Sequence, residues 1–147
     1  VDMVALARDV CEVLRRDARW AAHEVTLSGP EALTLDADPA QLRQMLWNLL
    51  KNALEASPAR APVEVRVERA AAGVALTVKD RGDGICPEIR AHMFEPFHTT
   101  KEGGTGLGLA VVHNIVTAHG GRIEVMSEAH AGTEMRVSLP SVTQAMG

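Results

Sequence analysis

Four segments in which apolar and polar residues alternate constrain the fold of this chain most. They span residues 61–70, 73–80, 122–128 and 133–140. A period of two residues is typical of β-strands that bury one face. The first two segments are joined by a short turn of small residues, which predicts an antiparallel hairpin. Two shorter alternating segments, at 22–29 and 32–37, predict further strands separated by a Gly29-Pro30 turn.

Helical periodicity accounts for most of the remaining chain. Apolar residues recur at spacings of three and four in residues 2–18, 39–56 and 106–119. Before the second of these segments, Asp38 can cap a helix, Pro39 suits its first position and Gln41 can complete a capping box. A short helix is also expected over 87–92. This order of elements predicts an α+β fold, a two-layer α/β sandwich whose mixed sheet packs against about three main helices.

Length, charge and cysteine content narrow the class of protein. A chain of 147 residues suits one domain, which we expect over 1–140, with a flexible tail over 141–147. The formal net charge of −4 and the lack of a basic run argue against nucleic acid as a partner. The distant Cys11 and Cys86 are expected to be reduced thiols of a cytoplasmic protein.

Membrane contact is not expected for this segment, because no apolar stretch reaches the roughly 18 residues that a membrane span needs. The chain begins at Val1 rather than at a methionine. We therefore expect it to be a segment of a longer parent, and whether that parent is membrane-anchored stays open.

The glycine-rich stretch EGGTGLGLA, residues 102–110, leads directly into the third helical segment. Glycines that open a helix offer backbone N–H groups to phosphate oxygens. The spacing of Gly104, Gly106 and Gly108 does not fit the dinucleotide fingerprint, and no Lys-Ser or Lys-Thr pair completes a Walker loop. Two interpretations stay open: a phosphate loop of another kind, or a flexible loop followed by a closely packed helix.

Asn48 and Asn52 lie four residues apart in the helical segment 39–56, among leucines. Residues at this spacing share one face of a helix. An amide oxygen is a hard ligand that suits Mg²⁺, which proteins usually hold with few side chains and substrate phosphates. The alternative is that both amides hydrogen-bond to neighbouring loops.

Asp80 ends the core-facing row of the strand segment 73–80. Burial of a carboxylate is costly unless it is paired, so Asp80 either turns outward or binds something specific. In DRGDGI, Gly82 and Gly84 follow it and allow a flat ring to approach the backbone, while a carboxylate can accept from an exocyclic amine such as that of adenine. Such a stretch can also be an ordinary turn, but the three signals together favour a nucleotide site.

In their order along the chain, five motifs resemble those of the ATP-binding catalytic domain of sensor histidine kinases. WNLLKNALEA resembles the N box, DRGDGI the first glycine box, FEPFHTTK the F box, GGTGLGLA the second glycine box and AGTEMRVSLP the closing glycine motif. The wider superfamily includes gyrase, MutL and heat-shock chaperone ATPases. The resemblance covers nearly the whole chain, and HTTK with HNIVTAHGGRIEV is most similar to kinases of the nitrogen-regulation type.

The resemblance implies a Bergerat fold that binds ATP and Mg²⁺, with an ATP lid over about 93–105. It implies that Asn52 ligates Mg²⁺, that Asn48 lies beside the γ-phosphate and that Lys101 reaches the phosphates. Asp80 would hold the adenine amino group, in a pocket shaped by glycines, and Thr133 would lie near the adenine. The implied nucleotide-binding set is Asn52, Asp80, Gly82, Gly84, Lys101, Gly104, Gly106, Leu107, Gly108 and Thr133, and the implied catalytic pair is Asn48 and Lys101.

The resemblance also implies an activity. ATP-hydrolysing relatives carry a glutamate where this chain has Asn48, and an amide cannot act as a general base. Transfer of the γ-phosphoryl to a histidine on a separate helical dimerisation domain is therefore favoured, with a response regulator receiver domain as a second partner. The alternatives are a nucleotide-sensing module without transfer and an anti-σ-type serine kinase. One departure is Glu55, where some kinases carry a basic residue.

The histidines carry no predicted metal chemistry. His23 and Glu24 do not continue as a zinc-binding helix, and His23 is expected to be a surface strand residue. His113 and His119 have no partner spacing that suggests a metal, so they are expected to be structural.

Overall fold

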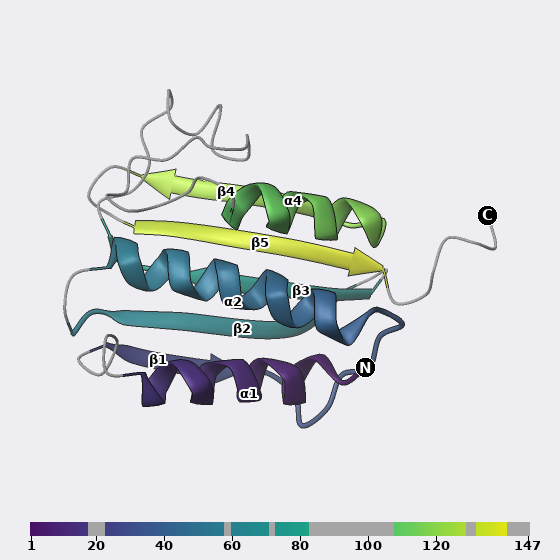
Figure 1. The fold of residues 1–147 in the computed structure, drawn as a ribbon, viewed down its shortest axis with the longest axis horizontal. Helices are drawn as coiled ribbons and strands as arrows, with labels where there is room; N and C mark the ends of the chain where they lie inside the picture. Colours follow the sequence, from purple (N-terminus) through teal and green to yellow (C-terminus); the bar gives the residue numbers. More distant parts are fainter. Residues whose placement is uncertain (18–22, 58–59, 71–72, 83–107, 129–131, 141–147) are drawn as a thin grey trace.

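The computed structural model describes residues 1–17, 23–57, 60–70, 73–82, 108–128 and 132–140. In these parts of the chain, three helices cover one face of a five-stranded sheet (Figure 1). The predicted α+β two-layer architecture is therefore confirmed. The expected short helix over 87–92, the lid over 93–105 and the tail over 141–147 lie outside the described residues.

The sheet is mixed and has the strand order β1-β2-β3-β5-β4. Strand β1 pairs in parallel with β2, and the remaining neighbours are antiparallel. The strands are β1 (Glu24–Ser28), β2 (Pro62–Ala70), β3 (Gly73–Lys79), β4 (Arg122–Glu128) and β5 (Gly132–Pro140). The four long alternating segments were thus predicted correctly, and the first two form the expected hairpin.

The helices are α1 (Met3–Arg16), α2 (Pro39–Ala56) and α4 (Gly108–Ala118). Figure 1 shows α2 between the other two, with α1 on the side of β1 and α4 over β5 and β4. Apolar side chains from the inner face of the sheet and from the helices form one core. Examples with no more than 1% exposure are Leu42, Leu46, Leu50, Val65, Leu76, Val112 and Val137. The outer positions of the strands, such as Glu64 and Arg66, are more polar and less buried.

The prediction of a strand over 32–37 is wrong. Thr34 forms a single antiparallel bridge with Asp2, and no longer pairing is present in this segment. Leu33 and Leu35 are buried as their alternation indicated, but their backbone groups bond to Val1, to Asp2 and to Met3, the first residue of α1. Because α1 begins at Met3, the available partner is too short for a strand.

The predicted cap of α2 is confirmed, but the capping box is not formed as expected. Asp38 Oδ1 accepts from the N–H groups of Ala40 (2.9 Å) and Gln41 (3.4 Å). The backbone N–H of Asp38, which Gln41 was expected to satisfy, donates instead to His119 Nε2 at 3.2 Å. A residue 81 positions away thus completes the cap.

His23 is not the surface strand residue that the sequence predicted. It is half-buried, precedes β1 and lies with Nε2 3.3 Å from the carbonyl oxygen of Ser57, at the end of α2. The start of β1 therefore contacts the C-terminal end of α2.

Candidate nucleotide-binding site

Asp80 is a buried carboxylate directly after β3, with 6% of its surface exposed. Its Oδ1 accepts hydrogen bonds from the N–H groups of Gly82 (2.9 Å) and Thr133 (3.2 Å). Its own N–H donates to the Thr133 carbonyl oxygen at 2.9 Å, which extends the pairing of β3 with β5 by one residue. These donors offset the cost of burying the charge and fix the orientation of the carboxylate.

Two glycines permit the backbone contacts around Asp80. A Cβ on Gly82 would overlap the carbonyl oxygen of Ala56, in the last turn of α2. A Cβ on Gly132 would overlap the carbonyl oxygen of Asp80, and the φ of +95° at Gly132 is one that other residues rarely adopt. The end of β3, where Asp80 follows the strand, therefore lies directly against the C-terminal end of α2.

Asn48 and Asn52 lie on one side of α2, and both are half-buried. Arg43 marks the opposite side, since it forms an ion pair with Asp9 of α1 (3.7 Å). At about 100° of rotation per residue, Asn52 lies about 180° around the helix from Arg43 and Asn48 about 140°. Because α1 and α4 flank α2, both asparagines project toward the side of α4 (Figure 1).

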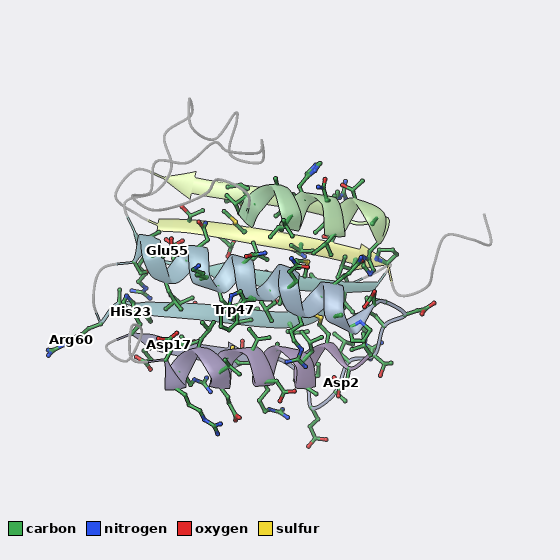
Figure 2. All side chains as sticks on the ribbon, in the orientation of Figure 1. Asp2, Asp17, His23, Trp47, Glu55 and Arg60 are labelled. Carbon is green, nitrogen blue, oxygen red and sulfur yellow. The ribbon has the colours of Figure 1, made fainter. Side chains whose placement is uncertain are left out.

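Trp47 and Glu55 agree with this assignment of faces. Figure 2 shows Trp47 projecting from α2 toward α1, where its half-buried ring packs against the core. Glu55 is exposed in the last turn of α2, seven residues after Asn48 and therefore on the same side (Figure 2). The departure from the family pattern at Glu55 thus lies beside the two asparagines.

The structure brings together predicted residues from four separate segments: α2, the residues after β3, the start of α4 and the start of β5. Ala56, which contacts Gly82, lies one helical turn after Asn52, so Asp80 and Asn52 belong to one continuous region. Helix α4, which packs against α2, begins at Gly108, the last glycine of the predicted phosphate loop. The predicted site residues Gly84, Lys101, Gly104, Gly106 and Leu107 lie outside the described residues.

Sequence reasoning missed two residues that shape the site, Gly132 and Ala56, and one contact of His119 at the far end of α2. Gly132 supports Asp80 and stands just before the predicted Thr133; its signal was a glycine at the start of an alternating segment. Ala56 lies in the predicted helix, and no role was expected for it; His119 is structural as expected, but its contact with the Asp38 N–H was not predicted. Their contacts join segments far apart in the chain, and no local pattern reports such contacts.

The site has the donor types that a nucleotide and its metal require. Within the described ranges, no group of three or more His, Cys, Asp or Glu side chains could hold a metal ion. A half-buried asparagine amide at Asn52 still suits Mg²⁺, which is commonly held by one or two protein groups and substrate phosphates. The residues present therefore fit the group that the motifs imply.

Comparison with known proteins identifies the family. Residues 37–143 match the family described as histidine kinase-, DNA gyrase B- and HSP90-like ATPases. The chain belongs to this family. Its relatives narrow the assignment: it is 38% identical over 141 residues to the sensor histidine kinase ZraS of Escherichia coli (strain K12), a match that covers 95% of this chain and 30% of ZraS. The chain is thus an ATP-binding catalytic domain of the sensor histidine kinase type.

Solved structures agree with the family assignment. The catalytic domain of histidine kinase ThkA superposes on this kinase domain with a TM-score of 0.85 and 29% identity, over 94% of this chain and 91% of that one. Full-length ShkA in complex with AMPPNP gives a TM-score of 0.86 and 34% identity, over 99% of this chain and 31% of ShkA. The chain therefore spans about a third of the length of ZraS and of ShkA. Among the described helices, none is both long and apolar enough to cross a membrane.

Proposed function

We propose that this domain binds Mg²⁺-ATP at the junction of β3, β5, α2 and α4, and that it donates the γ-phosphoryl group to a histidine on a separate helical dimerisation domain. The observation that carries the proposal is the contact of Gly82 with Ala56. This contact joins the buried carboxylate of Asp80 to the asparagine side of α2. An adenine-binding group and a phosphate-binding face thus form one site.

Asp80 is suited to bind the adenine ring. Its carboxylate is buried and held by two backbone N–H groups, so it is oriented before any ligand arrives. A preoriented acceptor favours a ligand that presents an N–H donor, such as the amino group of adenine. Gly84, by its proposed role, leaves room for the flat ring, and Thr133 lies beside the carboxylate.

Asn52 and Asn48 are suited to the phosphate end of the nucleotide. In this proposal Asn52 ligates Mg²⁺ through its amide oxygen, and the ion supplies charge neutralisation for the phosphates. Asn48 lies one turn earlier, where it can donate to a γ-phosphate oxygen. Lys101 and the N–H groups of Gly104, Gly106, Leu107 and Gly108 complete the phosphate contacts.

Asn48 also favours transfer over hydrolysis. Activation of water requires a general base within hydrogen-bond reach, and an amide cannot accept a proton at neutral pH. The domain then acts by positioning and by charge neutralisation, which provide most of the rate in phosphoryl transfer. The acceptor imidazole nitrogen attacks the γ-phosphorus, the bond from phosphorus to the bridging oxygen breaks, and ADP leaves.

The comparisons support the choice of partner and ligand. ZraS and ShkA are about three times as long as this chain, so related kinases contain further domains. ShkA binds AMPPNP, an ATP analogue, through a chain that includes a domain of the same fold. We therefore propose a phosphoacceptor domain in the parent of this chain, followed by transfer from its histidine to a response regulator receiver domain.

The test is reconstitution of transfer in trans. The 147-residue chain is mixed with the parent's helical domain and ATP labelled at the γ-phosphate, and the label on the helical domain is then exposed to acid and to alkali. Acid-labile, alkali-stable label is expected, and Asp80→Asn should reduce it. Binding of ATP without any label on the helical domain would contradict transfer and favour a nucleotide-sensing module. Acid-stable label on a serine would instead favour the anti-σ-type kinase.

A further inference from the structure

We propose that His119 is a positioning residue: it sets the register of α4 against α2 and so aligns the start of α4 with Asn48 and Asn52. The inference rests on the proposed function, because it concerns the phosphate end of the same nucleotide site. Its basis is the hydrogen bond from the Asp38 N–H, at the beginning of α2, to His119, at the end of α4. Both of these helix ends lie far from the proposed nucleotide site. This bond takes the place of the expected capping box.

The imidazole of His119 joins the end of α4 to the beginning of α2. Its Nε2 lies 3.2 Å from the backbone nitrogen of Asp38, and its Nδ1 lies 2.8 Å from the carbonyl oxygen of Ile115. A backbone N–H can only donate, so Nε2 must accept and Nδ1 must carry the proton. Nδ1–H then donates to Ile115, and the neutral ring satisfies both partners at once.

The backbone around His119 is fixed by the way α4 ends. Gly120 adopts a φ of 72°, and its N–H donates to the Thr117 carbonyl oxygen at 3.0 Å. The N–H of Gly121 donates to the Val116 carbonyl oxygen at 2.9 Å. This is the left-handed glycine ending of a helix. A Cβ on Gly121 would overlap the Ser138 carbonyl oxygen, so β5 also holds this turn.

The same hydrogen bond fixes which residues of the two helices lie side by side. The end of α4 meets the beginning of α2, so the helices run antiparallel (Figure 1). Both rise about 1.5 Å per residue. Gly108 therefore lies about 16 Å from His119 along α4, and Asn48 lies about 15 Å from Asp38 along α2. The start of α4 is thereby aligned with the turn that begins at Asn48 and ends at Asn52.

The His119 hydrogen bond adds a directional contact to the apolar packing between α4 and α2. The side of α4 that faces the core consists of aliphatic side chains, whose contacts are non-directional. The buried ones are Ala110, Val112, Ile115 and Val116. A slip of one residue would move the start of α4 by about 1.5 Å. Hydrogen-bond distances from nitrogen to oxygen vary by only about 0.5 Å, which is less than this shift. The N–H of Gly108, at the start of α4, would therefore miss its phosphate oxygen.

The effect on affinity follows from the fraction of molecules in the correct register. A ligand that requires one conformation binds more weakly in proportion to that fraction. Loss of the His119 hydrogen bond should shift the equilibrium toward slipped registers by about fivefold, the factor expected for one net hydrogen bond, and Mg²⁺-ATP binding should weaken by up to that factor. Adenosine, which lacks phosphates, depends on Asp80 and not on the register of α4. Its affinity should change by less than about twofold, because its hydrogen bonds are unaffected.

The experiment compares Mg²⁺-ATP and adenosine binding in the 147-residue chain and in His119 variants, by calorimetry and NMR titration, at temperatures where each variant is folded. His119→Ala should lower the ratio of the ATP affinity to the adenosine affinity, by up to about fivefold. His119→Gln, which retains an acceptor for the Asp38 N–H, should keep most of the ratio. His119→Leu keeps the volume of the side chain but has no acceptor for the Asp38 N–H. It tests the loss of this hydrogen bond if the alanine variant does not fold. His113→Ala is the matched control, because His113 is exposed on the same helix.

Three results would overturn the inference while the proposed function stands. The first is an unchanged ratio in His119→Ala, which includes an equal loss for ATP and adenosine. The second and third are the same fall in the ratio in His119→Gln and in His113→Ala. If the unaltered chain bound no Mg²⁺-ATP, the proposed function would fail and this inference with it. The unaltered chain therefore separates the two failures.

Discussion

Asp80 and Thr133 are joined by reciprocal hydrogen bonds: the Asp80 N–H donates to the Thr133 carbonyl oxygen (2.9 Å), and the Thr133 N–H donates to Asp80 Oδ1 (3.2 Å). The pair links the end of β3 to the beginning of β5 and orients a buried carboxylate. The backbone N–H groups of Gly82 and Thr133 hold this carboxylate in one orientation.

Asp80→Asn should weaken adenine nucleotide binding at least about tenfold, because a hydrogen bond to a charged group contributes about 1.5–3 kcal/mol. The asparagine oxygen can still accept from Gly82 and Thr133, so the variant should remain folded. Titration with ATP and a thermal unfolding curve measure the two properties. Asp36→Asn, at an exposed carboxylate, is the control. Wild-type affinity in a folded Asp80→Asn variant would contradict the adenine assignment.

Gly82→Ala should both destabilise the domain and weaken ATP binding, because the new Cβ would displace the Ala56 carbonyl from the site. Overpacking of this kind costs roughly 1–3 kcal/mol. Gly29→Ala is the matched control, since its Cβ would lie 2.8 Å from the Val67 carbonyl oxygen, outside the proposed site. Urea unfolding should show a loss of stability in both variants, and calorimetry should show weaker ATP binding in the Gly82 variant alone. Equal ATP affinities in the two variants would contradict a role for the contact of Gly82 with Ala56 in ATP binding.

Asn52→Ala should remove the part of ATP affinity that depends on Mg²⁺, because it deletes the amide oxygen proposed as the ligand. In the presence of EDTA, the variant and the unaltered chain should bind ATP with similar affinity. Asn114→Ala, at an exposed asparagine of α4, should retain the Mg²⁺ dependence. A full Mg²⁺ effect in the Asn52 variant would show that the ion is held elsewhere.

Glu55→Lys should tighten Mg²⁺-ATP binding by about twofold to fivefold, because exposed charges interact by about 0–1 kcal/mol. Glu55 shares its side of α2 with Asn48 and Asn52, so a cation there lies toward the phosphates. Glu12→Lys makes the same charge change on the exposed side of α1 and serves as the control. The gain should shrink as salt is added. An equal gain in ATP affinity from Glu12→Lys would show that net charge, and not the position of Glu55, causes the effect.

Asp2 provides a prediction about pH. The N–H groups of Leu33, then of Ala5 and Val4, donate to its carboxylate and lower its pKa below the ordinary 3.8. A lowered folded-state pKa stabilises the fold above the unfolded-state value, and that contribution is lost as the pH falls through the folded-state pKa. Asp2→Ala should therefore reduce the free energy of unfolding at pH 7, and the difference should shrink below about pH 4. Urea unfolding at several pH values measures it, and an equal difference at pH 7 and pH 3 would contradict the assignment.

The sequence predicted those features that repeat locally. The alternation over 61–70 and 73–80 identified the central hairpin and placed Asp80 at the end of a core-facing row. The sequence left open whether Asp80 turns outward, and the structure shows its carboxylate buried. The segment 32–37 alternates as well, but it lies beside the start of α1 and forms a single bridge. Periodicity reports which side chains are buried, and it does not report whether a partner strand is long enough.

Contacts between distant segments could not be predicted in the same way. Gly82 approaches Ala56 and Gly132 approaches Asp80 through backbone atoms, which leave no side-chain pattern beyond the glycines themselves. His119 replaces Gln41 in the cap of α2, although both residues are chemically able to accept from Asp38. Tertiary structure decides between such partners, because it determines which acceptor reaches the N–H group.

The most direct test of the central claim is an NMR titration of the chain with Mg²⁺-ATP. The account predicts saturable binding, with the largest backbone amide shifts at Gly82, at Thr133 and at the start of α4. In Asp80→Asn, all of these shift changes should require a higher ATP concentration to reach saturation. Absence of saturable binding, or shifts confined to the outer face of the sheet around Arg66 and Arg136, would contradict the account.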